Sequence, residues 1–282
     1  MRGRVPLMDE TLGPPSIDVI VLGAGGAGMM CALTAGGFGK RVLILDHMKQ
    51  AGGKILISGG GRCNFTNLGA TSANYVSKNP HFMKSAMSRY TPQDFIALVE
   101  KHQVPYHEKK LGQQFCDNRA KDIVDLLVRE CLDVGVKFEF ETQIKKLLKE
   151  ENGFRVVTSR GDYWAPQVVN CLGGLSLPKV GATGVGFELA RRFGHTIIET
   201  APALDGFTWN DSDLKRYQAM AGVSFDCVMT AGKKSFRENL LFTHGGLSGP
   251  ASLQASLHWN PGEKVHIQLL PDLDLKSHLL ER

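Results

Sequence analysis

The chain has 282 residues, 43% of them hydrophobic and 22% charged, so it is long enough to bury the core of one large domain or two. Its formal charge of +5 is small, and its basic pairs are flanked by apolar or acidic residues as on a solvated surface, so we expect no nucleic-acid partner. Six cysteines without a CxxC pair predict free thiols, no metal site and a cytoplasmic location.

Residues 1–16 form a lead-in that we expect to be flexible. They contain Pro14 and Pro15 but no apolar run as long as that of a signal peptide. The most apolar stretch, 17–35, is interrupted by glycines and has another explanation. We therefore expect no membrane partner.

The most informative motif is IDVIVLGAGGAG at residues 17–28, followed by the apolar run RVLILD that ends at Asp46. This combination predicts a βαβ unit that binds a dinucleotide. Gly23 allows a tight turn after the strand, Gly25 lets the backbone approach a pyrophosphate, and Gly28 lets the helix pack closely. Asp46 is placed to accept hydrogen bonds from a ribose. The alternative is a glycine-rich turn without a ligand.

The next elements alternate between glycine-rich passages and regular structure. We expect a helix over 26–35, a ligand-wrapping loop over 51–67, and helices over 91–102 and 119–134. Four short strands between 136 and 170 predict a β meander, and a helix follows over 185–193. Shorter β-like runs after 195–200 indicate a separate, mostly β module.

Three glycine clusters, at 23–28, 52–61 and 173–186, favour FAD over a nicotinamide cofactor as the resident ligand. A nicotinamide dehydrogenase usually needs the first cluster alone. The longer FAD also needs a grip on its adenosine and a loop beside its flavin. Arg62, in the second passage, can place a permanent charge on a phosphate oxygen.

Four segments make the chain resemble the YhiN/BaiN-like NAD(P)/FAD-dependent flavoproteins. They are GGKILISGGGRCNFTN (52–67), LGQQFCDNRAKDIVDLL (111–127), GGLSLPKVGATGVGFELARRFGH (173–195) and LFTHGGLSGPA (241–251). The resemblance implies an α/β fold: a glutathione-reductase-like, FAD-binding Rossmann domain over 17–197. A mostly β module is inserted over 198–282, and family members continue beyond it, so we expect the chain to be C-terminally incomplete.

The motif and the resemblance together give the expected cofactor-binding positions. The pyrophosphate and ribose would be held at the first turn, the flavin side at the second passage, and the adenine near Ile144. The positions are Gly23, Ala24, Gly25, Gly26, Ala27, Gly28, Asp46, His47, Gly53, Lys54, Gly61, Arg62, Cys63, Asn64, Ile144, Gly173 and Gly174. One departure from the family is Asn170-Cys171, where these flavoproteins usually carry Ala-Thr.

The resemblance implies a flavin-dependent oxidoreductase that holds FAD non-covalently and transfers hydride between NAD(P)H and a small organic substrate. The alternative is a truncated nucleotide-binding remnant without activity of its own. An RNA-modifying flavoenzyme is disfavoured, because the sequence shows no concentrated basic face. We expect Cys63 to have a packing role rather than a redox role. We expect His244 to shape a loop rather than to act as a substrate-facing acid. The catalytic residues and the oligomeric state stay open.

Overall fold

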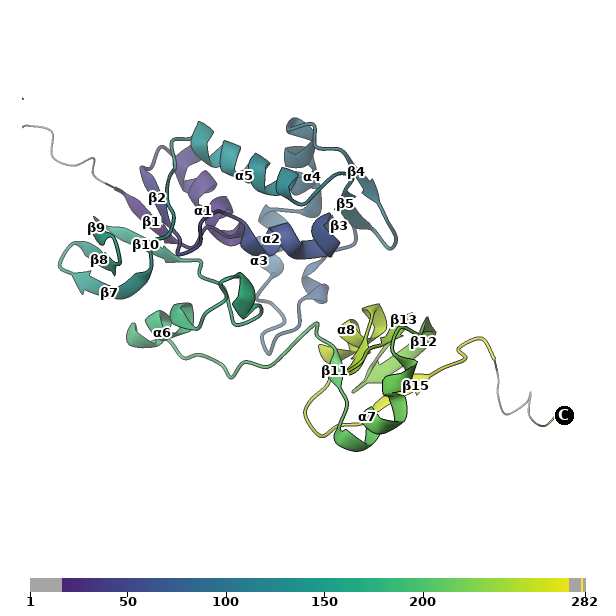
Figure 1. Ribbon diagram of the computed structural model, residues 1–282. Coiled ribbons are helices and arrows are strands. Elements are labelled where there is room, and N and C mark those ends of the chain that lie inside the picture. Colours follow the sequence, from purple (N-terminus) through teal and green to yellow (C-terminus); the bar gives the residue numbers. More distant parts are fainter. Residues whose placement is uncertain (1–16, 274–279, 281–282) are drawn as a thin grey trace, which may run out of the picture. The chain divides into compact units, whose positions relative to one another are not determined.

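The computed structural model describes residues 17–273 and 280, which divide into two compact units with their border between Ile197 and Ile198. Figure 1 labels their helices and strands along the chain. Among the described helices, none combines the length and the apolar character needed to cross a membrane.

The centre of unit 1 is a parallel sheet with strand order β10-β1-β2-β6. The strands are β1 (Val19–Leu22), β2 (Val42–Leu45), β6 (Lys137–Glu139) and β10 (Gln167–Asn170). In register, Val21 lies between Ile44 and Val169. The two inner strands read VIVL and VLIL and are almost wholly buried, as expected for parallel strands that are covered on both faces.

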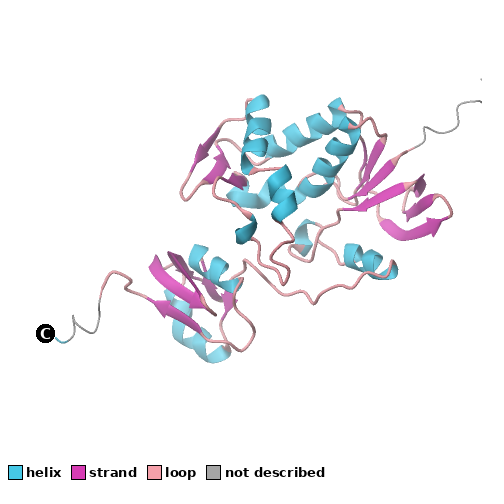
Figure 2. Cartoon of the chain, turned by 180° about the vertical axis from the view of Figure 1, so that it is seen from behind, coloured by secondary structure: helices cyan, strands magenta, loops and turns pink. Residues whose placement is uncertain are grey.

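Different elements cover the two faces of this sheet. Val21 and Ile44 pack with α1 (Gly26–Gly37) and α5 (Lys121–Asp133) in one core. Ile20, Leu22 and Leu45 share a second core with an antiparallel sheet and with α6 (Val185–Arg192). That sheet contains β7 (Ile144–Glu150), β8 (Gly153–Thr158) and β9 (Gly161–Ala165). Figure 2 shows these layers of unit 1, with its helices in cyan and its strands in magenta.

The remainder of unit 1 forms a smaller layer. A three-stranded sheet has the order β3 (Asn64–Asn67), β5 (Gln113–Cys116) and β4 (Tyr106–Glu108). The helix predicted over 91–102 is observed as α4 (Pro92–Lys101). Thr91 and Asp94 form a capping box at its start, and its first residue is a proline. The other helices are α2 (Gly53–Ile57), η1 (Ser58–Gly61), η2 (Ser72–Asn74), α3 (Lys84–Arg89) and η3 (Pro178–Val180).

Two predictions about this unit were wrong. Residues 51–67 are not a loop, because α2, η1 and β3 occupy most of them. The glycines concentrate at the start of α2 and within η1, so the apolar run between them remains free to be helical. The predicted meander is also divided. β6 and β10 join the parallel sheet, and Pro166, which lacks an N–H, separates β10 from β9.

Unit 2 contains a five-stranded sheet and the helices α7, η4 and α8. The sheet order is β11 (Phe207–Thr208), β14 (Gly246–Ser248), β13 (Lys234–Phe242), β12 (Ser224–Ala231) and β15 (Val265–Gln268). The helices are α7 (Asp211–Tyr217), η4 (Gln218–Met220) and α8 (Pro250–Ser256). α8 packs on β12 and β13, and its Ala251 and Ala255 are buried in the core of the unit.

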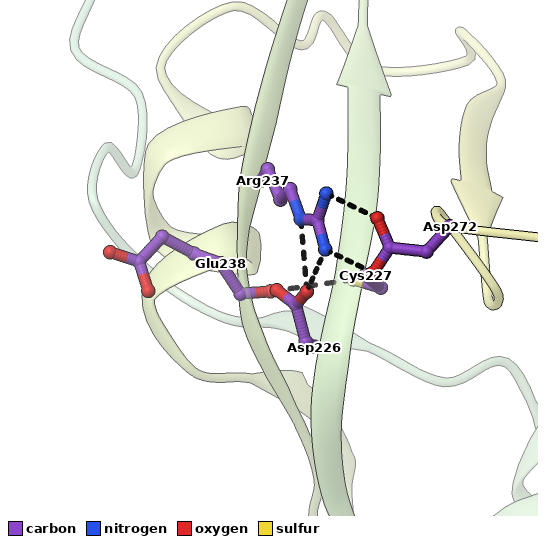
Figure 3. A network of polar contacts seen from close by, with 5 residues as sticks. All are labelled: Asp226, Cys227, Arg237, Glu238 and Asp272. Atoms are coloured by element: carbon purple, nitrogen blue, oxygen red, sulfur yellow. Dashed lines mark hydrogen bonds and ion pairs between the residues drawn. The ribbon is translucent and has the colours of Figure 1, made fainter.

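The hairpin that β12 and β13 form in unit 2 also carries a polar network, shown in Figure 3. The Arg237 guanidinium donates through Nε to Asp226 Oδ2 at 3.0 Å and through both terminal nitrogens to the Asp272 carboxylate, at 2.8 and 2.6 Å. These bonds hold the pKa of Asp272 below its usual range. The arginine thus ties the segment after β15 to the hairpin.

Candidate functional site

A cavity of about 190 Å³ lies where β1, β2 and β10 end. Ligands of open parallel sheets bind at this edge, beyond the carboxyl ends of the strands. Five short segments contribute to the lining: 23–27 after β1, 46–48 with residue 50 after β2, 52–55, 171–173 after β10, and 180–182.

Glycine is required by space at two positions of the first turn. Gly23 has a φ of +104°, and a Cβ there would lie 2.6 Å from the carbonyl oxygen of Cys171. A Cβ at Gly28 would lie 1.8 Å from the carbonyl oxygen of Gly23. Gly25 differs, since a Cβ there would meet nothing within 4 Å. The backbone at Gly25 is therefore open, on the segment that lines the cavity.

The helix that starts at this turn offers free N–H groups. α1 has twelve residues, its N-cap is Gly25, and no side chain caps it. The first N–H groups of a helix lack partners within the helix, and the helix dipole adds partial positive charge there. An anionic pyrophosphate fits this end of the cavity.

Asp46 is held in place by the backbone around it. Its Oδ2 accepts a hydrogen bond from the Ala24 N–H at 2.6 Å, and its Oδ1 accepts one from the Met48 N–H at 2.8 Å. The neighbouring His47 has its Nδ1 3.5 Å from the same Oδ1. A carboxylate has further lone pairs beyond two such bonds, so Asp46 can still accept from ribose hydroxyls.

Lys54 adds a positively charged amino group to the lining. It lies in α2, and its Nζ donates to Ser176 Oγ at 3.2 Å. A Cβ added to Gly173 would lie 3.2 Å from the same Nζ. Lys54 therefore joins the second glycine-rich passage to the loop that follows β10.

A second, larger hollow of about 860 Å³ shares several lining residues with the first. The shared side chains are those of His47, Met48, Gln50 and Leu172. The new part of its lining includes Ile144, which was predicted to contact the adenine. The two hollows together provide a path from the glycine turn past Asp46 to Ile144, as an extended dinucleotide requires.

Several predicted residues line neither hollow. Gly28 lies behind the turn, and Cys63 is 5% exposed, within the core. Burial raises the pKa of the Cys63 thiol, which agrees with packing rather than redox chemistry. The other predicted residues outside both linings are Gly61, Arg62, Asn64 and Gly174. His244 is exposed in unit 2, in the turn before β14.

The sequence reasoning missed other lining residues. Gly181 has a φ of +86°, and a Cβ there would lie 2.8 Å from both His47 Nε2 and Met48 Sδ. The third glycine cluster contained this signal, but no residue after Gly174 was singled out. Asn170 explains the departure from Ala-Thr, since its amide donates to the Gly186 carbonyl at 2.9 Å and so holds α6. Within the described ranges, no group of three or more His, Cys, Asp or Glu residues is placed to hold a metal.

A family model described as the HI0933-like protein Rossmann domain matches residues 17–254. Several curated relatives also match, and three of them cover most of the chain. The chain is 48% identical over 94% of its length to a ribosomal RNA dihydrouridine synthase of Escherichia coli (strain K12). It is 43% identical over 92% of its length to a protein of the same name from Haemophilus influenzae. It is 26% identical over 90% of its length to a 3-dehydro-bile acid delta(4,6)-reductase of Clostridium scindens, of which it covers 64%.

The chain covers 66% of each of the two ribosomal RNA dihydrouridine synthases. The match to the family model spans the glycine turn, Asp46, the second passage and the third cluster. The fold is therefore a Rossmann fold of the type that binds FAD.

Proposed function

This chain belongs to the HI0933-like Rossmann family, the YhiN/BaiN-like flavoproteins, and we propose that it reduces a uridine of ribosomal RNA to dihydrouridine with FAD as its cofactor. One observation carries this proposal. Two relatives are 48% and 43% identical to this chain over nearly its whole length. Both are named ribosomal RNA dihydrouridine synthases. The family consists of flavoprotein oxidoreductases, and the RNA substrate is what we propose for this chain.

The reaction adds two hydrogens across one carbon–carbon double bond of the uracil ring. That double bond is conjugated to a carbonyl, so one hydrogen arrives as hydride and the other as a proton. FAD supplies the hydride chemistry when bound, and NAD(P)H is the donor that we propose for its reduction. A delta(4,6)-reductase among the relatives, by its name, also acts at carbon–carbon double bonds.

The chain's own residues would bind and orient the cofactor. The N–H groups after Gly25 would hold the pyrophosphate, and Asp46 would accept from the adenosine ribose. Lys54 would compensate phosphate charge while keeping the loop after β10 in place. The open backbone at Gly25 supports this fit, because a side chain there would project into free space.

Two alternatives from the sequence remain candidates. A small organic substrate in place of RNA is favoured by the 26% identical relative whose name specifies a bile acid. A nucleotide-binding remnant without activity of its own is the other alternative. With ribosomal RNA as the substrate, we propose a cytoplasmic protein, as the free thiols also indicate.

The deciding experiment incubates the purified protein with FAD, NADPH or NADH, and ribosomal RNA that lacks dihydrouridine. Mass spectrometry of the digested RNA then measures uridine that has gained two hydrogens. Dihydrouridine that forms with the wild type, and not with the Asp46→Ala variant, supports the proposal.

The other outcomes distinguish the alternatives. A yellow protein that NAD(P)H bleaches, but that leaves the RNA unchanged, would favour the small substrate. A colourless protein that takes up no FAD would favour the remnant.

A further inference from the structure

The chain's positive charge is concentrated where acidic residues are absent. Residues 47–93 contain four lysines and two arginines but no aspartate or glutamate. The rest of the chain holds 27 Lys and Arg against 28 Asp and Glu. The whole net positive charge therefore resides in these 47 residues. Basic pairs do not reveal this region, because its basic residues are spaced apart.

Part of this region is an exposed stretch, residues 75–89, which we call the basic segment. It leads into α3 and includes that helix, drawn in blue in Figure 1. Lys78, Lys84 and Arg89 are exposed, and none of them forms an ion pair with another described residue. Elsewhere some exposed cations are paired, as Lys121 is with Asp125.

Two aromatic rings stand among these cations. Tyr75 is 47% exposed and Phe82 is 70% exposed. An exposed ring gains little from the protein core, so stability does not explain Phe82. Interleaved cations and exposed rings are the features with which proteins bind single-stranded nucleic acid, through phosphates and stacked bases.

Local hydrogen bonds hold the backbone of this stretch. Just before it, the Thr71 hydroxyl and the Asn74 amide cap each other in η2. Within it, Ser77 Oγ accepts from the Asn79 N–H at 3.1 Å, and Asn79 Oδ1 accepts from the His81 N–H at 3.0 Å. The exposed side chains therefore project from a backbone with a defined shape, which lowers the entropic cost of binding.

A shallow hollow of about 360 Å³ adjoins the basic segment. Its lining includes Lys84 together with hydroxyl groups of Thr71, Ser72 and Ser88, and Met87 adds an apolar surface. The Thr71 and Ser88 hydroxyls donate to Asn74 Oδ1 and to the Ser85 carbonyl, so their oxygens are left as acceptors. An ammonium donor and hydroxyl acceptors beside a small apolar surface suit a nucleotide. Tyr90, which follows the basic segment, is not one of the rings that we assign to it. Burial raises the pKa of its phenol, and the negative charges of Asp94 and Glu130 raise that pKa further, so its surroundings are acidic.

We propose that the basic segment binds single-stranded ribosomal RNA next to the target uridine. Lys78, Lys84 and Arg89 contact phosphates, and Tyr75 and Phe82 stack on bases. This inference rests on the proposed function. It opposes the expectation of no nucleic-acid partner, which was based on basic pairs. Charge favours RNA, because a small organic substrate has no series of phosphates to match three separated cations.

The test measures binding of a fluorescently labelled single-stranded RNA by the flavin-loaded protein, using fluorescence anisotropy at several salt concentrations. The first variant is Lys78→Ala/Lys84→Ala/Arg89→Ala. Its control is Lys137→Ala/Lys146→Ala/Lys149→Ala, which removes three exposed lysines of unit 1 from β6 and β7, near Glu139 and Glu150. The second variant is Tyr75→Ala/Phe82→Ala. Flavin absorbance and the melting temperature check each fold.

We expect the first variant to bind about tenfold more weakly or worse. The slope of log K against log salt concentration should fall in magnitude by up to about two, because three phosphate contacts are removed. The second variant should lose about fivefold or more for each stacked base, with its salt dependence kept. The control should bind like the wild type. Formation of dihydrouridine should fall in parallel in both variants, while reduction of the flavin by NAD(P)H stays unchanged.

Two results would overturn the inference, and they differ. If the wild type forms dihydrouridine and both variants bind RNA as it does, the basic segment is not the RNA surface and the proposed function stands. If the wild type neither binds RNA nor forms dihydrouridine, the proposed function fails together with the inference. If the triple variant loses its flavin, the aromatic variant decides.

Discussion

We call the glycine turn at residues 23–28 the cradle, since it would hold the cofactor. The cradle and the basic segment belong to the same unit but are built in opposite ways. The cradle consists of backbone in positions that side chains cannot enter, as at Gly23 and Gly28. The basic segment consists of side chains that leave the protein, such as Phe82 and Lys84. We therefore expect changes in the cradle to act through folding and cofactor retention, and changes in the basic segment to act on RNA affinity alone.

Gly28→Ala should have the largest effect. Its Cβ would lie 1.8 Å from a backbone oxygen that cannot move without displacing the turn. We expect a loss of at least about 3 kcal/mol in unfolding free energy, and no bound flavin. Urea denaturation and absorbance at the flavin band measure both.

The matched variant is Gly25→Ala, whose Cβ meets nothing within 4 Å. It should lose under about 1 kcal/mol of stability but bind FAD more weakly. Equal stability losses in the two variants would contradict the steric account of the cradle.

Asp46→Asn should have the next largest effect. The amide keeps one acceptor oxygen, so one of the two N–H donors, at Ala24 or Met48, loses its partner. We expect a cost of about 1–3 kcal/mol in unfolding free energy, and weaker FAD binding. Asp125→Asn, at an exposed helix pair, is the control and should change stability by less than about 1 kcal/mol. Similar losses in both would show that Asp46 is not structurally special.

The contact between the end of α4 and Glu130 of α5 should respond to acid. Burial raises the pKa of Glu130, but hydrogen bonds from Lys101 and His102 outweigh it, so the pKa lies below the ordinary 4.5. Ionised Glu130 therefore stabilises the folded protein at pH values above the pKa that this group has in the unfolded chain. The stabilisation is lost as the pH falls through the pKa that it has in the folded protein.

Urea midpoints measured from about pH 5 downward should therefore fall, and less steeply in Glu130→Gln than in the wild type. An unchanged slope in that variant would mean that other carboxyl groups cause the acid sensitivity.

Phe82→Ala should have the smallest effect on the fold. With 70% of the side chain exposed, we expect a change within about 0.5 kcal/mol in unfolding free energy and an unchanged flavin content. Calorimetry and absorbance measure these quantities. A larger loss would show that Phe82 is part of a core, and the contrast between the two regions would then disappear.

The sequence predicted the parts of this molecule that depend on local chemistry. The turn at Gly23, the position of Asp46 after β2 and the cap at Thr91 follow from rules that span a few residues. The pairing of β6 and β10 with the parallel sheet was missed, because their partners are distant in the sequence. Gly181 and Gln50 were missed for the same reason, since tertiary packing brings them to the cavity.

Some failures were avoidable. Residues 163–170 were expected to form the last strand of the meander, although Pro166 lies inside them and proline is rare within strands. In the structure, β9 ends just before Pro166. In the sequence, the basic segment is marked by the absence of acidic residues over 47–93 rather than by clustered basic residues, and its role stays a proposal. Arg62 and Asn64 lie outside both hollows, and their place beside the flavin stays a prediction.

The hydrogen bond from the Ala24 N–H to Asp46 has a consequence for exchange with solvent. Ala24 lines the cavity, and its N–H donates its hydrogen bond to the Asp46 carboxylate of the same chain. In deuterated water it should exchange slowly in the flavin-free protein, at a rate set by opening of the unit rather than by local fluctuation. The turn would then keep its shape through repeated loss and recapture of the cofactor, without refolding each time.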